Sequence, residues 1–273
     1  MLNKKILSTV FSLMIINSIA QCASLVEDPI PELKQRHGYL QQYSSGVYNA
    51  LVTPEIAELT LKKEQRFEEF LRLSFDEIVG KKLPIGFRLI HRHHTVPEGG
   101  GMVETFMYNE DNNPILCSKV SGTELVRQAC PASWIVHKDF EGKLSFNVLE
   151  FSTDSAVREI QGALEESHMP LMISLATRIS EFGLNELIAI AILGHSQLDQ
   201  FEGSKLVEIQ DSNSSYIMRL QDGEKFCSKG SLFTKTSWGP RTVACLSDHW
   251  CKQGYDSFLD RWRHQSERCH KHT

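Results

Sequence analysis

The side chains best suited to chemistry are concentrated in one short run, Phe87-Arg88-Leu89-Ile90-His91-Arg92-His93-His94. If this run is a β-strand, successive side chains point to opposite faces of the sheet. His91 and His93 then share one face, while Arg88, Arg92 and His94 share the other. We predict a binding site that uses Arg88, Arg92, His91 and His93, and we treat His94 as a candidate catalytic residue.

A carboxylate can meet these histidines if the glycine-rich segment 97–101 turns the chain back into a second strand, 102–108. In the expected hairpin register His94 faces Glu104, and a slip of one residue brings His93 there instead. An imidazole oriented by a carboxylate is a general base, whereas two histidines and a carboxylate are a ligand set for zinc. A solvated hairpin face is the third interpretation. Glu104 is therefore a candidate catalytic residue, and we assign no metal and no cofactor from the sequence.

A second candidate is Ser196, within Gly194-His195-Ser196-Gln197-Leu198. This run resembles the nucleophile elbow of α/β-hydrolases, with a later aspartate (Asp211 or Asp222) and His249 as partners. The elbow has glycine two residues after the serine because the turn is tight, and Leu198 stands there. The alternative is a buried apolar helix that ends at Gly194.

The first twenty residues predict export. Two lysines precede a short apolar run, 6–16, and the small residues at 18–20 suit cleavage by a signal peptidase. The apolar run is shorter than the ~20 residues that span a membrane. We expect a secreted or periplasmic protein with no transmembrane segment. Cys22 also gives the boundary a loose resemblance to a lipidation signal, although Gln21 occupies a position that favours a small residue.

The charge of the chain restricts its partners. There are 29 Lys and Arg residues, two of them in the signal, against 34 Asp and Glu residues. Because no basic run remains after cleavage, nucleic acid is not an expected partner. We expect the partner to be a small molecule or a host protein.

Cysteine usage predicts disulfide bonds. Besides Cys22 the chain has six cysteines, and an even set in an oxidising compartment indicates pairing. An alternative is a zinc site made by Cys251, Cys269, His249 and His270. We prefer local pairs, each closing a short loop: Cys117–Cys130, Cys227–Cys245 and Cys251–Cys269.

A repeat suggests the architecture. Cys117-Ser118-Lys119-Val120-Ser121 recurs as Cys227-Ser228-Lys229-Gly230-Ser231, each after a turn signal and a β-rich run. Helical patterns precede each copy, at 54–79 in the first half and at 152–167, 170–182 and 185–193 in the second. A last helix is expected at about 255–268.

These patterns predict an α+β fold with an antiparallel sheet, built from two related halves that each carry helices and then a β-meander stapled by disulfides. We expect one compact unit of two halves after the signal and an N-terminal extension. The boundaries are a signal peptide at 1–20, the extension at 21–53, a first half at 54–150 and a second half at 151–273.

Paired helices followed by three antiparallel strands, twice over, resemble the chorismate lyase-like fold. The segment 103–120, a strand, an Asp-Asn-Asn-Pro turn and a second strand, is similar to the central hairpin of that family. The resemblance implies a ligand pocket between sheet and helices. In general character the chain also resembles exported proteins of intracellular Gram-negative pathogens.

Two functional hypotheses follow. The first is a binding or host-interaction protein that uses such a pocket or the segment 88–94. The second is a secreted hydrolase that uses Ser196 or the cluster of His91, His93, His94 and Glu104.

Overall fold

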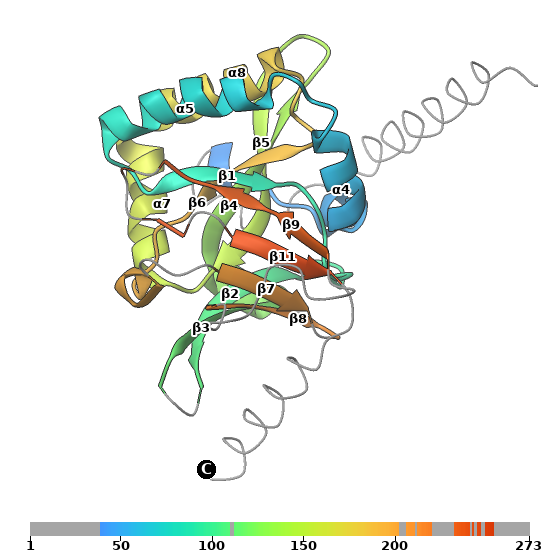
Figure 1. Cartoon of the computed structure of the whole chain (residues 1–273), viewed down its shortest axis with the longest axis vertical. Helices are drawn as coiled ribbons and strands as arrows, with labels where there is room; N and C mark the ends of the chain where they lie inside the picture. Colours follow the sequence, from blue (N-terminus) through green and yellow to red (C-terminus); the bar gives the residue numbers. More distant parts are fainter. Residues whose placement is uncertain are drawn as a thin grey trace, which may run out of the picture.

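The computed structural model describes residues 39–109, 112–201, 206–210, 212–219, 232–240, 242, 245–246 and 249–253. They form an α+β fold in which helices pack against a curled, mostly antiparallel sheet (Figure 1). This confirms the predicted class. Within these ranges, none of the helices combines the length and the apolar character needed to cross a membrane.

Two of the described helices begin at a side chain that caps them, Ser44 in the first half of the chain and Asp154 in the second. The Asp154 carboxylate accepts hydrogen bonds from Ala156 N and Val157 N at the start of the first helix of the second half. The described α-helices are α3 (Ser45–Asn49), α4 (Pro54–Leu61), α5 (Phe67–Lys81), α6 (Thr123–Gln128), α7 (Ser155–Ser167) and α8 (Met169–Glu181). Short 3-10 helices occupy Tyr39–Gln41 and Leu198–Phe201.

The single helix predicted at 54–79 is wrong, because α4 and α5 are separated by a turn. The separating residues, Lys62-Lys63-Glu64-Gln65-Arg66, are all polar. A helical turn there has no apolar side chain to bury, so the chain bends instead of continuing.

The strands belong to one sheet, with the order β10-β1-β6-β4-β5-β2-β3-β8-β7-β11-β9. Most neighbours are antiparallel, while β2 with β5 and β7 with β11 are parallel. The bounds are β1 (Ile85–Leu89), β2 (Gly101–Tyr108), β3 (Pro114–Ser121), β4 (Cys130–Lys138), β5 (Leu144–Ser152), β6 (Ile188–Ile192), β7 (Leu206–Gln210), β8 (Ser214–Arg219), β9 (Leu232–Lys235), β10 (Ser237–Trp238) and β11 (His249–Gln253).

The two edges of this sheet are joined by one short stretch of chain. β9 pairs with β11 at one edge and β10 pairs with β1 at the other, and only Thr236 separates β9 from β10. Gly86 permits the close approach, since a Cβ there would collide with the backbone of Trp238. The sheet therefore curls round on itself and encloses an interior face.

The outer face of β1, β4, β5 and β6 packs against α5, α7 and α8 (Figure 1). The side chains of Phe70, Trp134, Leu175 and Ile190 are fully buried in this core. The Trp134 indole donates to Leu40 O at 2.8 Å, which ties the N-terminal segment to the sheet. This core leaves the interior face of the sheet free for other side chains.

The helix predicted at 185–193 is also wrong. Residues 185–187 form a turn and 188–192 form β6, which lies between β1 and β4. All five residues of Ile188-Ala189-Ile190-Ala191-Ile192 are buried. A strand covered on both faces has the same continuous apolar pattern as a buried helix, so periodicity could not separate the two.

The predicted hairpin between 88–94 and 102–108 does not form. β1 ends at Leu89 and pairs with β6 and β10, whereas β2 pairs with β3 and β5. Residues 90–100, here called the ligand loop, connect β1 to β2 across the curled sheet. The alternation of faces expected for 88–94 therefore stops at Leu89.

The predicted disulfide Cys117–Cys130 is wrong. Both cysteines are buried and free, and Cys130 Sγ donates to Ser152 O at 3.2 Å. Cys117 lies on β3 and Cys130 on β4, with β5 and β2 between them. Three strand spacings are roughly 14 Å, and a disulfide needs Cα atoms within about 7 Å. Closeness in sequence was a misleading guide because α6 separates the two strands.

Several predictions lie outside the described residues. They include the signal peptide at 1–20, the second repeat copy at 227–231, the C-terminal helix at 255–268 and both Cys227 and Cys269. The two halves at 54–150 and 151–273 contribute to one sheet, in which β6 separates β1 from β4.

The two buried thiols give the first testable expectation. Burial raises the pKa of Cys117 and of Cys130 to about 11, so both remain protonated and unreactive near neutral pH. Differential alkylation followed by peptide mapping should label both cysteines on unfolding without any reductant, and neither in the native protein. Labelling that requires reductant would contradict the free thiols.

Candidate functional site

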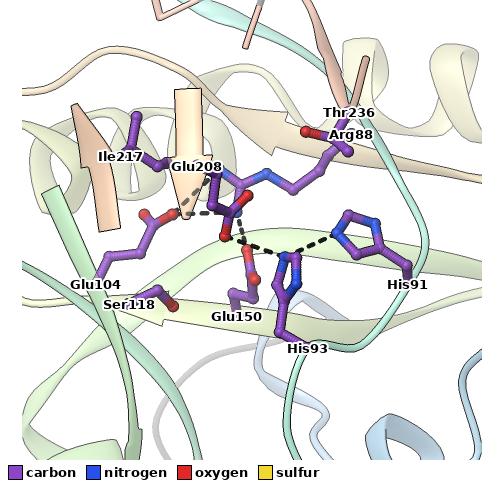
Figure 2. A pocket seen from close by; sticks show the side chains of 9 residues that line it. All are labelled: Arg88, His91, His93, Glu104, Ser118, Glu150, Glu208, Ile217 and Thr236. Carbon is purple, nitrogen blue, oxygen red and sulfur yellow. Dashed lines mark hydrogen bonds and ion pairs between the residues drawn. The ribbon is translucent and has the colours of Figure 1, made fainter. Parts of the chain in front are cut away.

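The interior face of the curled sheet carries a layer of polar side chains (Figure 2). This layer lies between two apolar clusters. Along β2, Met102 belongs to one apolar cluster, Glu104 to the polar layer, and Phe106 packs against the other cluster. Inward positions of a strand recur every second residue, so β2 contributes one residue to each level. A small cavity lies in this layer. Its lining residues are Arg88, His91, His93, Glu104, Ser118, Glu150, Glu208, Ile217 and Thr236.

An ionic network occupies one side of this layer. Both terminal nitrogens of Arg88 lie 3.1 Å from Glu104 Oε1, and Arg88 Nη1 also contacts Glu150 Oε2. His195 Nε2 lies 3.4 Å from Glu104 Oε2. Burial alone would favour the neutral acid, but the Arg88 guanidinium and His195 outweigh it and lower the pKa of Glu104 to about 2. Glu104 is therefore a carboxylate that holds Arg88 in place.

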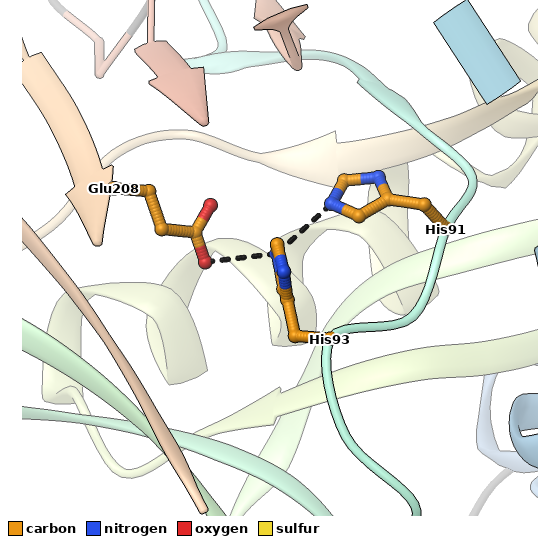
Figure 3. A group of neighbouring side chains, drawn as sticks. All are labelled: His91, His93 and Glu208. Carbon is orange, nitrogen blue, oxygen red and sulfur yellow. Dashed lines mark hydrogen bonds and ion pairs between the residues drawn. The ribbon is translucent and has the colours of Figure 1, made fainter. Parts of the chain in front are cut away.

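Two histidines and a glutamate converge beside this network (Figure 3). His93 Nε2 lies 2.9 Å from His91 Nε2 and 3.0 Å from Glu208 Oε1. One ligand atom from each of the three residues lies within 4.8 Å of the others. The side chains of His93 and Glu208 are only 3% and 6% exposed. These three residues could together offer three ligand atoms to a metal ion.

The local backbone fixes which nitrogen of His91 is available. His91 Nδ1 lies 2.6 Å from Leu89 O, and a carbonyl only accepts, so Nδ1 carries the proton. Burial, and next the neighbouring His93, lower the pKa of His91 to about 3 and keep it neutral. Its Nε2 therefore presents a lone pair toward His93 and Glu208, as a metal-binding histidine does when a carbonyl orients it.

The other side of His93 contacts Gln210, the last residue of β7. The contact is made by the amide nitrogen of Gln210, which donates to His93 Nδ1. In the neutral ring the proton then lies on Nε2, between the lone pair of His91 and the Glu208 side chain. A metal ion would take the place of that proton, with the Gln210 amide turned so that its oxygen accepts from Nδ1.

The charged groups of the polar layer also favour a bound cation. Among the described residues that line the cavity, the carboxylates Glu104, Glu150 and Glu208 face a single guanidinium, Arg88. A cation bound at Glu208 would add positive charge to a lining that holds three carboxyl groups and one guanidinium.

The structure separates the predicted site residues into two groups. Arg88, His91, His93 and Glu104 all line the cavity. His94 lies on the ligand loop with its ring centroid 6.3 Å from that of His93, and the Glu104 carboxylate contacts Arg88 and His195 instead.

Arg92 points away from the cavity toward the N-terminal segment. Its Nε donates to Leu51 O at 2.8 Å, and its Nη1 donates to Thr95 Oγ1 at 3.1 Å. Arg92 therefore anchors the ligand loop, and its guanidinium is occupied by hydrogen bonds within the protein.

Ser196 follows β6 and precedes a 3-10 helix, but its hydroxyl does not face an imidazole. Ser196 Oγ donates to Asp154 Oδ2 at 2.6 Å, and the same carboxylate caps α7. The adjacent His195 turns to Glu104. Asp211 and Asp222 lie outside the described residues. The contacts of Ser196 join the end of β6 to α7, and they lack the base that a nucleophilic serine needs.

Sequence reasoning missed Glu150, Glu208 and His195. Glu150 and Glu208 are charged residues inside apolar strand patterns, Val-Leu-Glu-Phe in β5 and Leu-Val-Glu-Ile in β7. A charged residue at a buried strand position indicates either an ionic partner or a functional site. These two glutamates could therefore have been singled out from the sequence. Which residues they meet depends on strand order, which one sequence does not give.

No protein-family model matches the chain, and neither a curated protein nor a solved structure is significantly similar to it. The resemblance to the chorismate lyase-like fold therefore stays a prediction, and the site is interpreted from its own geometry.

Replacing Glu104 with Gln tests the ionic network. Loss of the carboxylate leaves the buried Arg88 with one ionic partner fewer, and we expect unfolding to become easier by about 3 kcal/mol. Because the pKa of Glu104 is lowered to about 2 in the folded protein, its contribution is complete above about pH 4.5 and disappears as the pH falls toward 2. Denaturant unfolding at several pH values measures both effects.

The control is Glu159→Gln, the same chemical change on the exposed surface of α7. We expect that variant to unfold within about 0.5 kcal/mol of the original protein. An equally small effect of Glu104→Gln, or a difference that does not shrink below pH 4.5, would contradict the network.

Proposed function

We propose that this protein is an exported binding protein whose ligand is a divalent transition-metal ion held by His91, His93 and Glu208. The observation that carries the proposal is the convergence of two imidazole nitrogens and a carboxylate oxygen in the buried interior, with His93 Nε2 at 2.9 and 3.0 Å from the other two ligand atoms. The cavity lining, with three carboxyl groups to one guanidinium, also suits a cation.

The ligand types favour zinc or a similar ion. Imidazole suits zinc, copper, nickel and iron, whereas calcium and magnesium prefer sites made only of oxygen ligands. Two histidines and one carboxylate leave a fourth position for water. When bound, the metal would add positive charge to the interior.

The size of the cavity favours metal binding over catalysis on an organic substrate. The space between the lining side chains is about 10 Å³, close to the lower limit for a single water molecule. Organic ligands need pockets of about 300–1,000 Å³. The cluster of His91, His93 and Glu104 therefore supports a binding role better than the hydrolase hypothesis.

The remaining predictions from the sequence stand as part of this proposal. The signal at 1–20 supports export, and in an oxidising compartment Cys251–Cys269 would be a disulfide. The repeat at 117–121 and 227–231 supports two related halves. A host protein as partner also stays a prediction.

Metal titration of the purified chain tests the proposal. We expect about one Zn²⁺ per chain to remain bound after dialysis. An excess of about a hundred times the dissociation constant should stabilise the fold by about 2.7 kcal/mol. His93→Ala and Glu208→Gln should each weaken binding at least about a hundredfold, since even outer contacts of metal ligands contribute 10–100-fold.

His168→Ala is the matched control, because His168 lies between α7 and α8, outside the cavity lining. Its affinity and stoichiometry should equal those of the original protein. Equal zinc binding by the His93 and Glu208 variants would place the metal elsewhere and contradict the site.

A further inference from the structure

The ligand loop is held by the segment before α4. Residues 43–52, here called the strap, contact the loop in antiparallel order from one end to the other. Tyr43 OH donates to Gly100 O, and Ser45 Oγ accepts from Gly99 N at 3.3 Å. Asn49 makes two reciprocal bonds with the backbone of Val96, both 2.9 Å.

The strap ends on the residue between the two metal-site histidines. Arg92 N donates to Val52 O at 2.9 Å, and Arg92 Nε donates to Leu51 O at 2.8 Å. Tyr48 adds apolar packing, because it is buried in the same cluster as Ile90 and Val96. The loop is therefore fastened to the strap at residues 92, 96, 99 and 100.

The three metal-site residues are anchored unequally. Glu208 is the central residue of β7, which is paired with β8 on one side and β11 on the other. His91 and His93 lie on the ligand loop, which has no strand on either side. Local opening starts where backbone bonds are few, so the loop and its strap are the wall that can move.

Opening is required because the site is enclosed. His91 and Glu208 are 6% and 5% exposed, and the cavity is about 10 Å³. A hydrated divalent ion cannot pass through such a space. The ion must therefore arrive and leave while part of the wall is displaced.

We propose that the strap gates the metal site, so that release of residues 43–52 from the ligand loop controls the uptake and loss of the ion. This inference rests on the proposed function. Weakening the strap favours the open form of both the metal-bound and the metal-free protein. The rate constants of binding and release should then rise together, and the dissociation constant should change little.

Asn49→Ala tests the gate, since it removes both bonds to Val96 and leaves His91, His93 and Glu208 in place. In stopped-flow mixing with Co²⁺, and with a chelator for release, we expect both rate constants to rise about tenfold. The dissociation constant should stay within about threefold. Tyr43→Phe, which keeps the ring packed against Phe151, should raise both rate constants in the same way.

The matched control is Asn185→Ala. Asn185 also makes two side-chain bonds, to Val136 O at 3.2 Å and Ser180 Oγ at 2.9 Å, away from the strap. Its rate constants should equal those of the original protein. Faster release without faster binding in the Asn49 and Tyr43 variants, or no change in either rate constant, would overturn the gate while leaving the metal site intact. Absence of cobalt binding by the original protein would overturn both proposals.

Discussion

The structure depends on how three carboxylates are accommodated inside a curled sheet. Glu104, Glu150 and Glu208 come from β2, β5 and β7, and their side chains meet in a layer between two apolar clusters. Arg88 contacts the first two. Glu208 faces the imidazole of His93 instead. The divalent cation proposed at Glu208 would add positive charge to this layer and would bind the two histidines that converge there.

The same arrangement brings together segments that are far apart in the sequence. The ligand loop follows β1, and β7 lies far along the sequence, so a bound ion would cross-link two distant segments. β9 and β10 join the edges of the sheet through Thr236, which also lines the cavity. The residue that closes the sheet therefore also contributes to the packing of its interior. The strap adds a third segment, which holds the loop that carries two of the ligands.

The sequence indicated part of this site for sound physical reasons. The run at 88–94 is unusually rich in groups that bind anions or metals, and Arg88, His91, His93 and Glu104 do line one cavity. The pairing of His94 with Glu104 expected from the sequence is wrong because it assumed a hairpin. A glycine-rich turn between two β-like runs usually gives one, but here β6, β4 and β5 lie between β1 and β2.

The other failures have a common cause. Residues 188–192 are apolar throughout because both faces of β6 are covered, which hides the difference between strand and helix. Cys117 and Cys130 are close in sequence and three strand positions apart in the sheet. The sequence shows Glu208 as a charged residue within an apolar strand pattern. Which residues it contacts depends on the order of the strands in the sheet. Local patterns predicted the class of fold and the chemistry of one loop, while long-range pairing decided the site.

X-ray absorption spectroscopy at the zinc edge identifies the atoms that bind the metal. On the full chain loaded with one equivalent of zinc, we expect only nitrogen and oxygen neighbours at about 2.0–2.1 Å, with the outer-shell pattern of two imidazoles. Sulfur neighbours at about 2.3 Å would contradict it, because they would place the metal on cysteines such as Cys251 and Cys269 instead of on His91, His93 and Glu208.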